Sequence, residues 1–310
     1  MDVLITGYPS LDHIAKVSRS PAVGETARLL ELPDQVTYGG CGTNVAAALA
    51  RLGFRVGAAV VLGDDRYGAD YLRHLAALGI DTTNVIALPG ELTSHSYLFL
   101  NPDGQYQNFF LPGAADAWRG PLVLSGLESC RFALVSVGQF DYNRQFVAQV
   151  RAAGVPLVWA LKSDIVAYPP EMIGEFLAAS AYVVMNHIEA SYVLRALDRR
   201  AVESLIGETT CAVVITRGAS GAQVYTPGGV TAVSAVPPRQ VVDPTGAGDG
   251  FTAGFLAGLL RGASPEVSAQ LGAVVASFVL EAVGCQTNLP DWPQALARFT
   301  QHFGQFAGEE

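Results

Sequence analysis

The chain has 310 residues, of which 50% are hydrophobic and 15% are charged, and its formal net charge is −9. This length is enough for one large domain, and we expect a single domain over residues 1–310. The acidic balance argues against nucleic acid or an anionic membrane as a partner, because both require clustered basic side chains. Only Lys16 and Lys162 are lysines.

The cysteines indicate a reducing compartment. Cys41, Cys130, Cys211 and Cys285 are widely spaced and form no C-x-x-C pair, so we expect reduced thiols that are buried as small hydrophobes. The N-terminal sequence lacks the basic region and long apolar core of a signal peptide, and no apolar stretch is long enough to span a membrane. We therefore expect a cytoplasmic protein.

Short apolar runs alternate with helical patterns along most of the chain. Strands are predicted at 2–7, 55–63, 133–138, 156–161, 181–186 and 211–218. Helices are predicted at 44–52, 70–79, 143–153, 170–179, 188–197, 201–207, 249–262, 265–283 and 291–303. Strands that are apolar on both faces and alternate with helices predict an α/β fold, with a mainly parallel central sheet and helices on both faces.

Two segments break this alternation, at 14–38 and 93–113. The second has the pattern of a β-hairpin with its turn at "NPDG". Two strand-rich inserts in an α/β domain predict a small β-rich lid over an active site. Because a lid of this kind leaves strand edges and an apolar face exposed, we expect a homodimer that forms through it.

The segment 241–260, "VVDPTGAGDGFTAGFLAGLL", is rich in glycine and leads into an apolar helix. The backbone N–H groups of Gly246, Ala247 and Gly248 can bind an anion at the helix N-terminus, aided by the helix dipole. The next residue, Asp249, is then well placed to accept a proton from a substrate hydroxyl as a general base. The alternative is that Asp249 only caps the helix and the glycines only pack.

Four motifs together resemble those of the ribokinase-like (PfkB) carbohydrate and nucleoside kinases. "DPTGAGDGFTAGF" is similar to the second signature of the family, with Pro244 in place of the common threonine, and "GGCGTNVAAALARLG" resembles the first. "NHIEA" and "TRGASGA" resemble the N-x-x-E and T-x-G-x-x-G elements. The four occur in the family's order over most of the chain. The resemblance implies a three-layer ribokinase-like fold and an ATP-dependent kinase that transfers the γ-phosphate to a hydroxymethyl group.

The resemblance also assigns roles to individual residues. It makes Asp249 the catalytic base, with the preceding glycine loop as the anion hole. It places Asp12, Gly39, Gly40 and Asn44 at the substrate. Carboxylates and amides suit polyol hydroxyls, and paired glycines permit close backbone approach. The alternatives are that Asp12 is a turn residue after the first strand and that Asn44 is a helix N-cap, a role it could combine with substrate binding.

For the nucleotide, the resemblance implies that Asn186, Thr216, Gly218 and Gly221 contact ATP and its phosphates. Glu189 would hold Mg²⁺ through water, since magnesium keeps most of its own waters. The alternative for Asn186 and Glu189 is simple helix capping with a first-turn acid.

A monovalent cation such as K⁺ is implied beside the anion hole, at positions comparable to Asp243, Thr245, Gly284 and Asn288. The sequence departs from the family where many members carry a D-P-N segment, because "WALKSD" stands there. Lys162 or Asp164 of that segment could contribute to phosphate or metal binding, but the resemblance assigns neither a role.

The substrate is predicted to be neutral. Residues 93–118 contain no lysine or arginine, which phosphorylated or acidic sugars would require. The same stretch contains six aromatic residues: Tyr97, Phe99, Tyr106, Phe109, Phe110 and Trp118. They suit either lid packing or a stacked base, so a neutral sugar and a nucleoside both stay open. In addition, His95 could touch the substrate, and Cys41 could line its pocket.

Two other functions are compatible with these motifs. One is an ADP-dependent kinase, although that group is usually much longer and has a larger lid. The other is a non-catalytic protein on the same fold that binds a sugar or nucleoside. The intact Asp249, glycine loop, Asn186 and Glu189 favour an enzyme over this binding protein.

Overall fold

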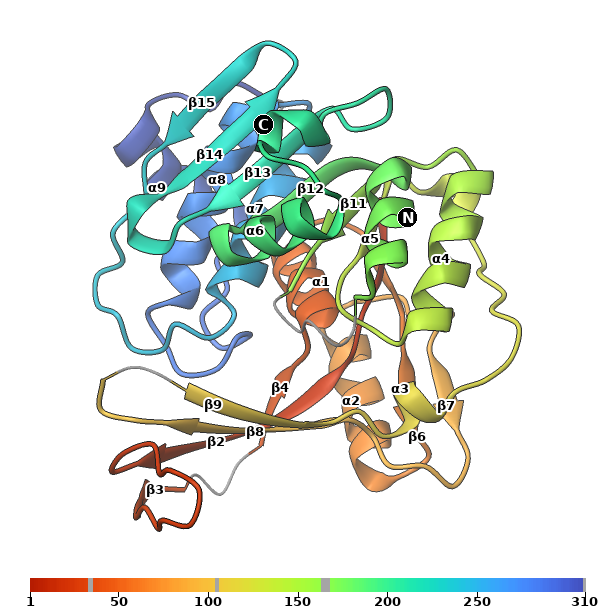
Figure 1. Ribbon diagram of the computed structural model, residues 1–310, viewed down its shortest axis with the longest axis vertical. Coiled ribbons are helices and arrows are strands. Elements are labelled where there is room, and N and C mark those ends of the chain that lie inside the picture. The colour runs from red at the N-terminus through yellow and green to blue at the C-terminus, as the bar shows by residue number, and fades with distance from the viewer. Residues whose placement is uncertain (33–35, 104–105, 163–167, 309–310) are drawn as a thin grey trace.

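The computed structural model describes residues 1–32, 36–103, 106–162 and 168–308 (Figure 1). Within this part of the chain, the larger sheet has eight strands in the order β15-β14-β13-β12-β11-β10-β1-β5. The strands from β5 to β13 are parallel, whereas β14 and β15 add an antiparallel hairpin at one edge. Their bounds are β1 Val3–Thr6, β5 Val56–Ala59, β10 Phe132–Val135, β11 Leu157–Ala160, β12 Ser180–Asn186, β13 Ala212–Thr216, β14 Ala222–Thr226 and β15 Gly229–Val233.

Helices cover both faces of this sheet, and each face has its own apolar core. Helices α1, α7, α8 and α9 pack on one face, and α4, α5 and α6 pack on the other (Figure 1). Their bounds are α1 Cys41–Arg51, α4 Phe140–Ala152, α5 Pro170–Ala179, α6 His187–Ala196, α7 Ala247–Leu260, α8 Pro265–Val279 and α9 Trp292–Phe303. The predicted three-layer α/β fold is thereby confirmed.

A second, smaller sheet lies beside the large one and is called here the small sheet. It consists of β2 Ser10–Val17, β3 Leu29–Glu31, β4 Thr37–Gly39, β8 His95–Leu100 and β9 Tyr106–Leu111. Strands β8 and β9 form the antiparallel hairpin that the sequence predicts, and β8 pairs with β2 in parallel. Residues 104 and 105, at the predicted turn, lie outside the described residues. Separately, β6 Val61–Gly63 pairs with β7 Ile86–Leu88.

The helix α2, Arg66–Ala77, lies between β6 and β7 in the chain, and the short α3, Ala114–Ala117, follows β9. The side chain of Asp65 caps α2 by accepting from the N–H of Gly68 at 2.7 Å. Asp65 also accepts from Thr93, both from its N–H and from its hydroxyl, just before β8. One carboxylate therefore fixes the start of the helix and the entry to the small sheet.

Several predicted elements were wrong in extent or type. The single strand predicted at 55–63 is two strands, β5 and β6, because β6 leaves the large sheet to pair with β7. The helix predicted at 201–207 is only a short 3-10 turn at Val202–Leu205. The β14–β15 hairpin was not predicted, and the small sheet begins at Ser10 rather than at residue 14.

The topology points to one crevice for a ligand. The chain places β5 on one side of β1 and later places β10 on the other side, so the direction of strand order reverses at β1. In open α/β sheets, ligands bind outside the carboxyl ends of the strands at such a reversal. Tyr8 follows β1 and Ser136 follows β10, so the site should lie between them.

All four cysteines are unpaired, as predicted. Cys41, Cys130 and Cys285 are buried, but the prediction was wrong for Cys211, which is exposed just before β13. Among the described residues, no helix combines the length and the apolar character that a membrane crossing requires.

Candidate active site

A cavity of about 600 Å³ opens where the strand order reverses, between the carboxyl ends of the large sheet and the small sheet. Ten of the residues to which the family resemblance assigns a role line it: Asp12, Gly40, Asn44, Asn186, Glu189, Thr216, Thr245, Gly246, Gly248 and Asp249. The motifs, which are spread over most of the chain, therefore converge on one site.

The glycine loop makes a left-handed turn that opens helix α7. Gly246 is the N-cap of α7 and has φ of 78°, in the left-handed region that favours glycine. A Cβ at this position would lie 2.6 Å from the Cβ of Cys285, so the close approach also excludes a side chain. The N–H of Ala247 donates to the carbonyl oxygen of Pro244 at 3.3 Å, and the N–H groups of the first turn have no acceptor within the helix itself, as at any helix N-terminus. Positive potential is thereby concentrated beside Asp249.

Asp249 lies in the first turn of α7 and faces the cavity. Its Oδ2 accepts a hydrogen bond of 2.8 Å from Nδ2 of Asn44. Burial raises the pKa of the Asp249 carboxyl, while the positive charge of Lys162 and the hydrogen bond from Asn44 oppose that rise. A raised pKa makes the carboxylate a better proton acceptor.

Asn44 is not the helix N-cap considered from the sequence. Helix α1 begins at Cys41, and its N-cap is Gly40, so Asn44 sits one turn inside the helix and is buried. Its Nδ2 donates to Asp249, and its Oδ1 accepts a 2.9 Å hydrogen bond from Nε2 of Gln286. Its amide therefore contacts the Asp249 carboxylate, a contact that the sequence did not reveal.

Two more residues that the sequence did not single out extend this contact. Gln286, in the loop after α8, places its Oε1 2.8 Å from Nε2 of His74, in α2. The His74 ring stacks on Tyr38 of β4, with ring centroids 3.8 Å apart and planes 8° apart. No local pattern marks either residue as functional, because an isolated glutamine and an isolated histidine occur on many surfaces.

Asp12 lies inside β2 and not in a turn, and it is buried at the cavity. Its Oδ1 accepts a 2.7 Å hydrogen bond from Ser10 Oγ. The carboxylate lies so close to Gly39 that any Cβ at that residue would collide with it. Burial raises the pKa of Asp12 to about 6, although Ser10 and the positive charge of Lys162 lower it.

On the opposite side of the cavity, Asn186 and Glu189 form a capping box at the start of α6. Asn186 Oδ1 accepts from the N–H groups of Ile188 and Glu189, and Glu189 Oε2 accepts from the N–H of Asn186 at 2.6 Å. The capping alternative is thus correct, and both side chains also line the cavity. Glu189 is buried, so its carboxylate is held rigidly there.

The T-x-G-x-x-G element is the end of β13 and the turn that follows it. Thr216 lines the cavity, whereas Gly218 and Gly221 lie in the turn beyond it. Gly221 has φ of 82°, and a Cβ there would collide with the carbonyl oxygen of Val233. Gly221 is therefore required by the packing of the β13–β14 turn.

Three of the four residues assigned to a monovalent cation, Asp243, Thr245 and Gly284, are joined by hydrogen bonds next to the glycine loop. The buried Asp243 accepts from the N–H of Thr245 at 2.9 Å and from the N–H of Gly284 at 3.0 Å. Asn288 Nδ2 donates to the carbonyl of Phe278, so only its oxygen side remains for a cation. The Oγ1 of Thr245 is buried and has no hydrogen-bond partner among the described residues, which fits a cation ligand.

Lys162 follows β11 and reaches the cavity, where its Nζ donates to Cys41 Sγ at 3.0 Å. Its charge acts on both Asp12 and Asp249, since it opposes the rise in their pKa values. Burial raises the pKa of Cys41 to about 12, so this thiol is a neutral wall of the pocket, as predicted. Asp164 lies outside the described residues.

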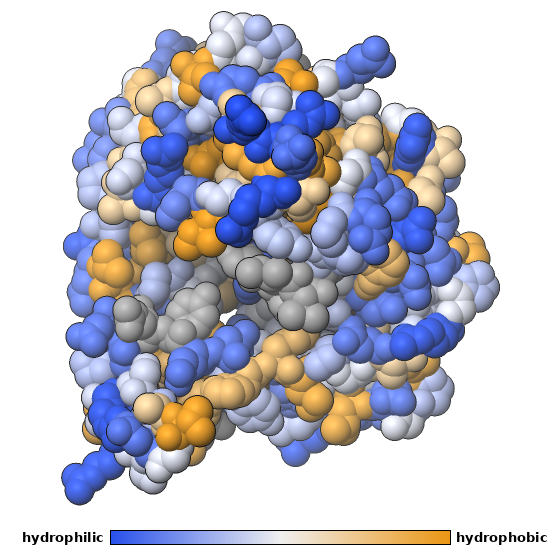
Figure 2. Space-filling model, in the orientation of Figure 1, coloured by the Kyte–Doolittle hydropathy of each residue, from blue (hydrophilic) through white to orange (hydrophobic). Residues whose placement is uncertain are grey.

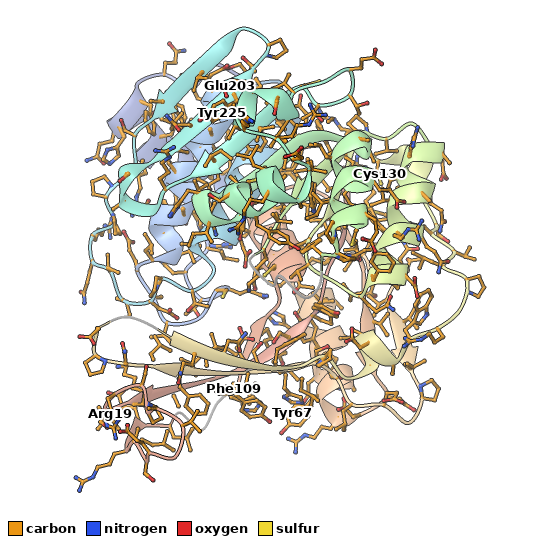
Figure 3. All side chains as sticks on the ribbon, viewed as in Figure 1. Arg19, Tyr67, Phe109, Cys130, Glu203 and Tyr225 are labelled. Carbon is orange, nitrogen blue, oxygen red and sulfur yellow. The ribbon has the colours of Figure 1, made fainter. Side chains whose placement is uncertain are left out.

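Of the six aromatic residues considered for the substrate, Phe110 is the one that lines the cavity among those whose side chains are described. Side chains alternate across a strand, so Asn108 and Phe110 of β9 point inward while Phe109 points outward (Figure 3). The Phe110 ring packs against Tyr8 with centroids 5.0 Å apart. Trp118 is buried in the core against Tyr142.

The expectation that His95 could touch the substrate was wrong. His95 does not line the cavity, and its Nδ1 lies 2.9 Å from Nε2 of His13 on the neighbouring strand β2. The two rings lie beside Tyr97 on the small sheet.

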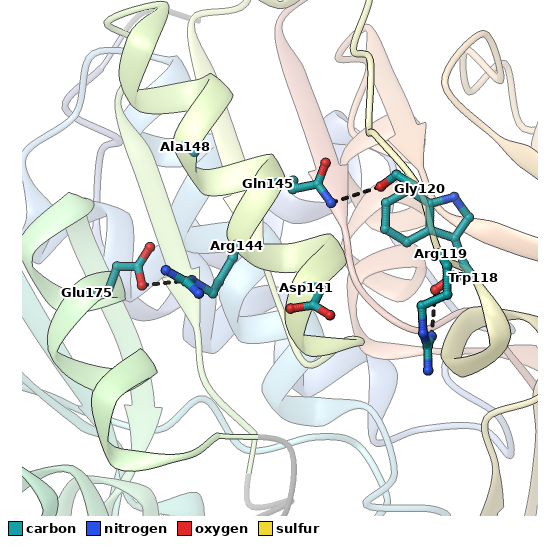
Figure 4. Close-up of a pocket in the computed structure, with 8 residues that line it drawn as sticks. All are labelled: Trp118, Arg119, Gly120, Asp141, Arg144, Gln145, Ala148 and Glu175. Atoms are coloured by element: carbon teal, nitrogen blue, oxygen red, sulfur yellow. Dashed lines mark hydrogen bonds and ion pairs between the residues drawn. The ribbon is translucent and has the colours of Figure 1, made fainter.

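A second cavity, of about 390 Å³, lies at the surface between α4 and the turn that contains Trp118 and Arg119 (Figure 4). Arg144 on its floor pairs with Glu175 at 3.0 Å. Arg119 donates to carbonyl oxygens of its own turn. None of the motif residues lines this cavity, so the larger one is the candidate active site.

A carboxylate beside a glycine-rich helix N-terminus, at the carboxyl edge of an α/β sheet, suits a phosphotransferase with an alcohol group as acceptor. The family model for the pfkB family carbohydrate kinases matches residues 3–292. The chain belongs to this family.

Characterised relatives match over nearly the whole chain. A nucleoside kinase of Methanocaldococcus jannaschii is 29% identical, over 97% of this chain and 97% of that protein. A ribokinase of Arabidopsis thaliana is 27% identical, over 93% of this chain and 78% of that protein. The crystal structure of the Methanocaldococcus jannaschii nucleoside kinase, an archaeal member of the ribokinase family, superposes with a TM-score of 0.86 at 27% identity, covering 97% of this chain and 98% of that one.

Proposed function

We propose that the protein is an ATP-dependent nucleoside kinase that transfers the γ-phosphate to the hydroxymethyl group of the ribose, with Asp249 as the general base. The observation that carries the proposal is the position of Asp249 in the first turn of α7, beside the N–H groups of the glycine loop. The matches with kinases of the same family over almost the whole chain support it.

In this mechanism Asp12 accepts hydrogen bonds from substrate hydroxyls and so orients the sugar. Asp249 takes the proton of the attacking hydroxyl as that oxygen forms its bond to phosphorus. The N–H groups at Gly246, Ala247 and Gly248 stabilise the charge on the transferring group. Lys162, which reaches the same cavity, adds a fixed positive charge.

The nucleotide is proposed to lie along Asn186, Thr216 and the turn with Gly218 and Gly221. Among the described residues, no cluster of three or more histidine, cysteine or acidic side chains could hold a metal ion by itself. Mg²⁺ bound through waters and phosphates, with Glu189 nearby, needs no such cluster. When bound, it would neutralise phosphate charge. Potassium is proposed at Asp243 and Thr245, where the unpartnered hydroxyl fits it.

A nucleoside is favoured over a free sugar by the inner face of the small sheet. Phe110 and Tyr8 present a pair of rings to the cavity, and Asn108 presents an amide. An aromatic ring can stack on a base, and an amide can hydrogen-bond to the edge of the base, whereas ribose offers neither a flat ring nor such an edge. The nucleoside kinase activity of the Methanocaldococcus jannaschii relative points the same way.

The test is phosphate transfer from ATP to a panel of nucleosides and free sugars, with Mg²⁺ and K⁺ present. Turnover with a nucleoside and little with ribose is expected. Phe110→Leu should raise the KM for that nucleoside about tenfold, since stacking is worth about 1–3 kcal/mol. Phe109→Leu changes the adjacent outward-facing ring and should leave KM unchanged. Turnover with ribose alone would refute the nucleoside assignment.

The same assay separates an enzyme from a binding protein on this fold. Asp249→Asn should lower kcat by about 10²–10⁴-fold while ATP still binds. Binding of a nucleoside without any turnover in the unmodified protein would instead support the non-catalytic alternative. A preference for ADP over ATP as the phosphate donor would support an ADP-dependent kinase.

The small sheet is proposed to act as a lid and as the surface of a homodimer. Its outer face exposes Leu30, Tyr97, Phe109 and Leu111, whose solvent-exposed fractions are 58%, 40%, 61% and 42%. In Figure 2 this part of the molecule, at the lower left, shows hydrophobic residues among hydrophilic ones. A second copy of the chain would cover them. Tyr97→Asp should convert a dimer to a monomer in sedimentation velocity, and a monomeric unmodified protein would contradict the proposal.

The four unpaired thiols support a cytoplasmic location.

A further inference from the structure

Three consecutive hydrogen bonds lead from the candidate base to a histidine outside the cavity lining. Asn44 Nδ2 donates to Asp249 Oδ2 at 2.8 Å, Gln286 Nε2 donates to Asn44 Oδ1 at 2.9 Å, and Gln286 Oε1 lies 2.8 Å from His74 Nε2. The four residues come from α7, α1, the loop after α8, and α2. Four separate segments therefore meet in one chain of polar groups.

The direction of this chain is set by the carboxylate at its end. An ionised carboxylate only accepts, so Asn44 must turn its N–H group toward Asp249 and its oxygen toward Gln286. Gln286 must then offer its N–H to Asn44 and its oxygen to the imidazole. His74 must accordingly carry a hydrogen on Nε2. The reverse order of donors would fit only a protonated Asp249.

His74 is held so that it can keep this role. Its ring stacks on Tyr38, meets Tyr71 edge-on and is half-buried in the last turn of α2. Burial lowers the pKa of His74, although the bond to Gln286 opposes this, so the ring is neutral at neutral pH. Protonation would add a hydrogen at Nδ1 and leave the Nε2–H in place. The chain therefore does not depend on the charge of His74.

We propose that Gln286 and His74 are positioning residues, which hold the amide of Asn44 with its N–H group on the Asp249 carboxylate and so keep the base in its ionised form. The proposal rests on the proposed function, in which Asp249 accepts the proton of the substrate hydroxyl. Without Gln286, the Asn44 amide can rotate and present its oxygen to Asp249, which favours the protonated acid.

Other groups also act on Asp249. Lys162 at the end of β11 and the thiol of Cys41 at the start of α1 favour its ionised form, whereas burial opposes it. Asp12 of β2 and the thiol of Cys285 also face the same space. These groups stay in place when Gln286 or His74 is changed. A shift that both variants share is then due to the chain of hydrogen bonds.

The experiment compares the pH dependence of kcat at saturating substrate in the unmodified protein, Gln286→Met and His74→Phe. The substrate is kept at saturating concentration because protonation of Asp12 changes how tightly the substrate binds. The acid limb of the profile, where Asp249 becomes protonated, should move to a pH about one unit higher in both variants. At pH values below the limb, this shift lowers kcat about tenfold relative to the unmodified protein. At alkaline pH the rates should converge with that of the unmodified protein.

Tyr38→Phe is the matched control, because it keeps the ring that stacks on His74 and should leave the acid limb in place. His74→Phe also keeps an aromatic ring stacked on Tyr38, and residue 74 lies outside the loop that contains Gly284 and Asn288. This variant therefore still tests the proposal if Gln286→Met alters that loop or fails to fold. ATP binding by each variant confirms that it is folded.

An equal loss of kcat at every pH would mean that the two residues only support the structure, and it would overturn the proposal. So would an acid limb that does not move. The Asp249→Asn variant keeps this result separate from the proposed function. If that variant is inactive and the limb is still unmoved, the positioning role alone fails. If it stays active, the general-base role of Asp249 fails.

Discussion

Replacing Asp12 with asparagine should stabilise the folded protein at neutral pH even though it removes the carboxylate that we propose to bind substrate. Burial raises the pKa of the Asp12 carboxyl from 3.8 to about 6, against the hydrogen bond from Ser10 and the charge of Lys162. The folded protein therefore holds this proton more tightly than the unfolded chain does. Keeping Asp12 ionised at neutral pH must consequently reduce the free energy of unfolding.

The size of this stabilisation follows from the shift in the pKa of Asp12, because each pKa unit corresponds to about 1.4 kcal/mol. The cost of ionising Asp12 is about 3 kcal/mol above pH 6, roughly half of that at pH 5, and close to zero below the unfolded value of 3.8. Asparagine has the same shape and still accepts from Ser10 Oγ. Asp12→Asn should therefore be more stable at pH 8 by about 3 kcal/mol, with a smaller gain at pH 5.

Urea unfolding of both proteins at pH 8 and at pH 5 measures this difference directly. In parallel, KM for the nucleoside should rise because asparagine has only one acceptor oxygen where the carboxylate has two. A variant that is less stable than the unmodified protein at pH 8 would refute the reasoning. A difference that is the same at both pH values would also show that ionisation of Asp12 is not its source.

Three further changes test other parts of the structure. Lys162→Met should lower kcat about 100-fold, because it removes a positive charge that reaches the cavity; an unchanged kcat would exclude that role. Glu189→Gln should raise the Mg²⁺ concentration needed for half-maximal rate, while the capping box survives because glutamine also caps; an unchanged Mg²⁺ dependence would place the metal elsewhere. Gly254→Ala should destabilise by about 1–3 kcal/mol in urea unfolding, since its Cβ would lie 2.5 Å from the carbonyl oxygen of Leu271 in α8, whereas Gly207→Ala meets nothing within 4 Å and serves as the control.

The parts of the site that the sequence predicted are those with a local pattern. A glycine loop that opens a helix has a recognisable order of residues, so the surroundings of Asp249 could be anticipated. The fold class followed from the alternation of apolar strands and helices. Four motifs in family order then placed Asn186 and Thr216 at the same site, and the structure brings both to the cavity.

The remaining parts depend on contacts between distant segments. Asn44 and Asp249 are 205 residues apart, and nothing near either one predicts their hydrogen bond. Gln286 and His74 have ordinary sequence surroundings. The two faces of β9 could not be told apart before its pairing with β8 was known, so Phe109 and Phe110 looked equivalent. The β14–β15 hairpin was missed because β15 is largely exposed and lacks the apolar run of a buried strand.

The contact between Asn44 and Asp249 has a consequence for how the protein is made. The parallel strands β1, β5, β10, β11, β12 and β13 all precede residue 217, whereas the helix that carries Asp249 begins at Ala247. Closing a loop of about 200 residues costs conformational entropy that must be overcome before the contact forms. A chain still emerging from the ribosome can therefore assemble most of its large sheet while it has no means of moving phosphate. With Asp249 as the proposed base, catalysis requires that α7 has docked against α1, so activity arises only after most of the chain has folded.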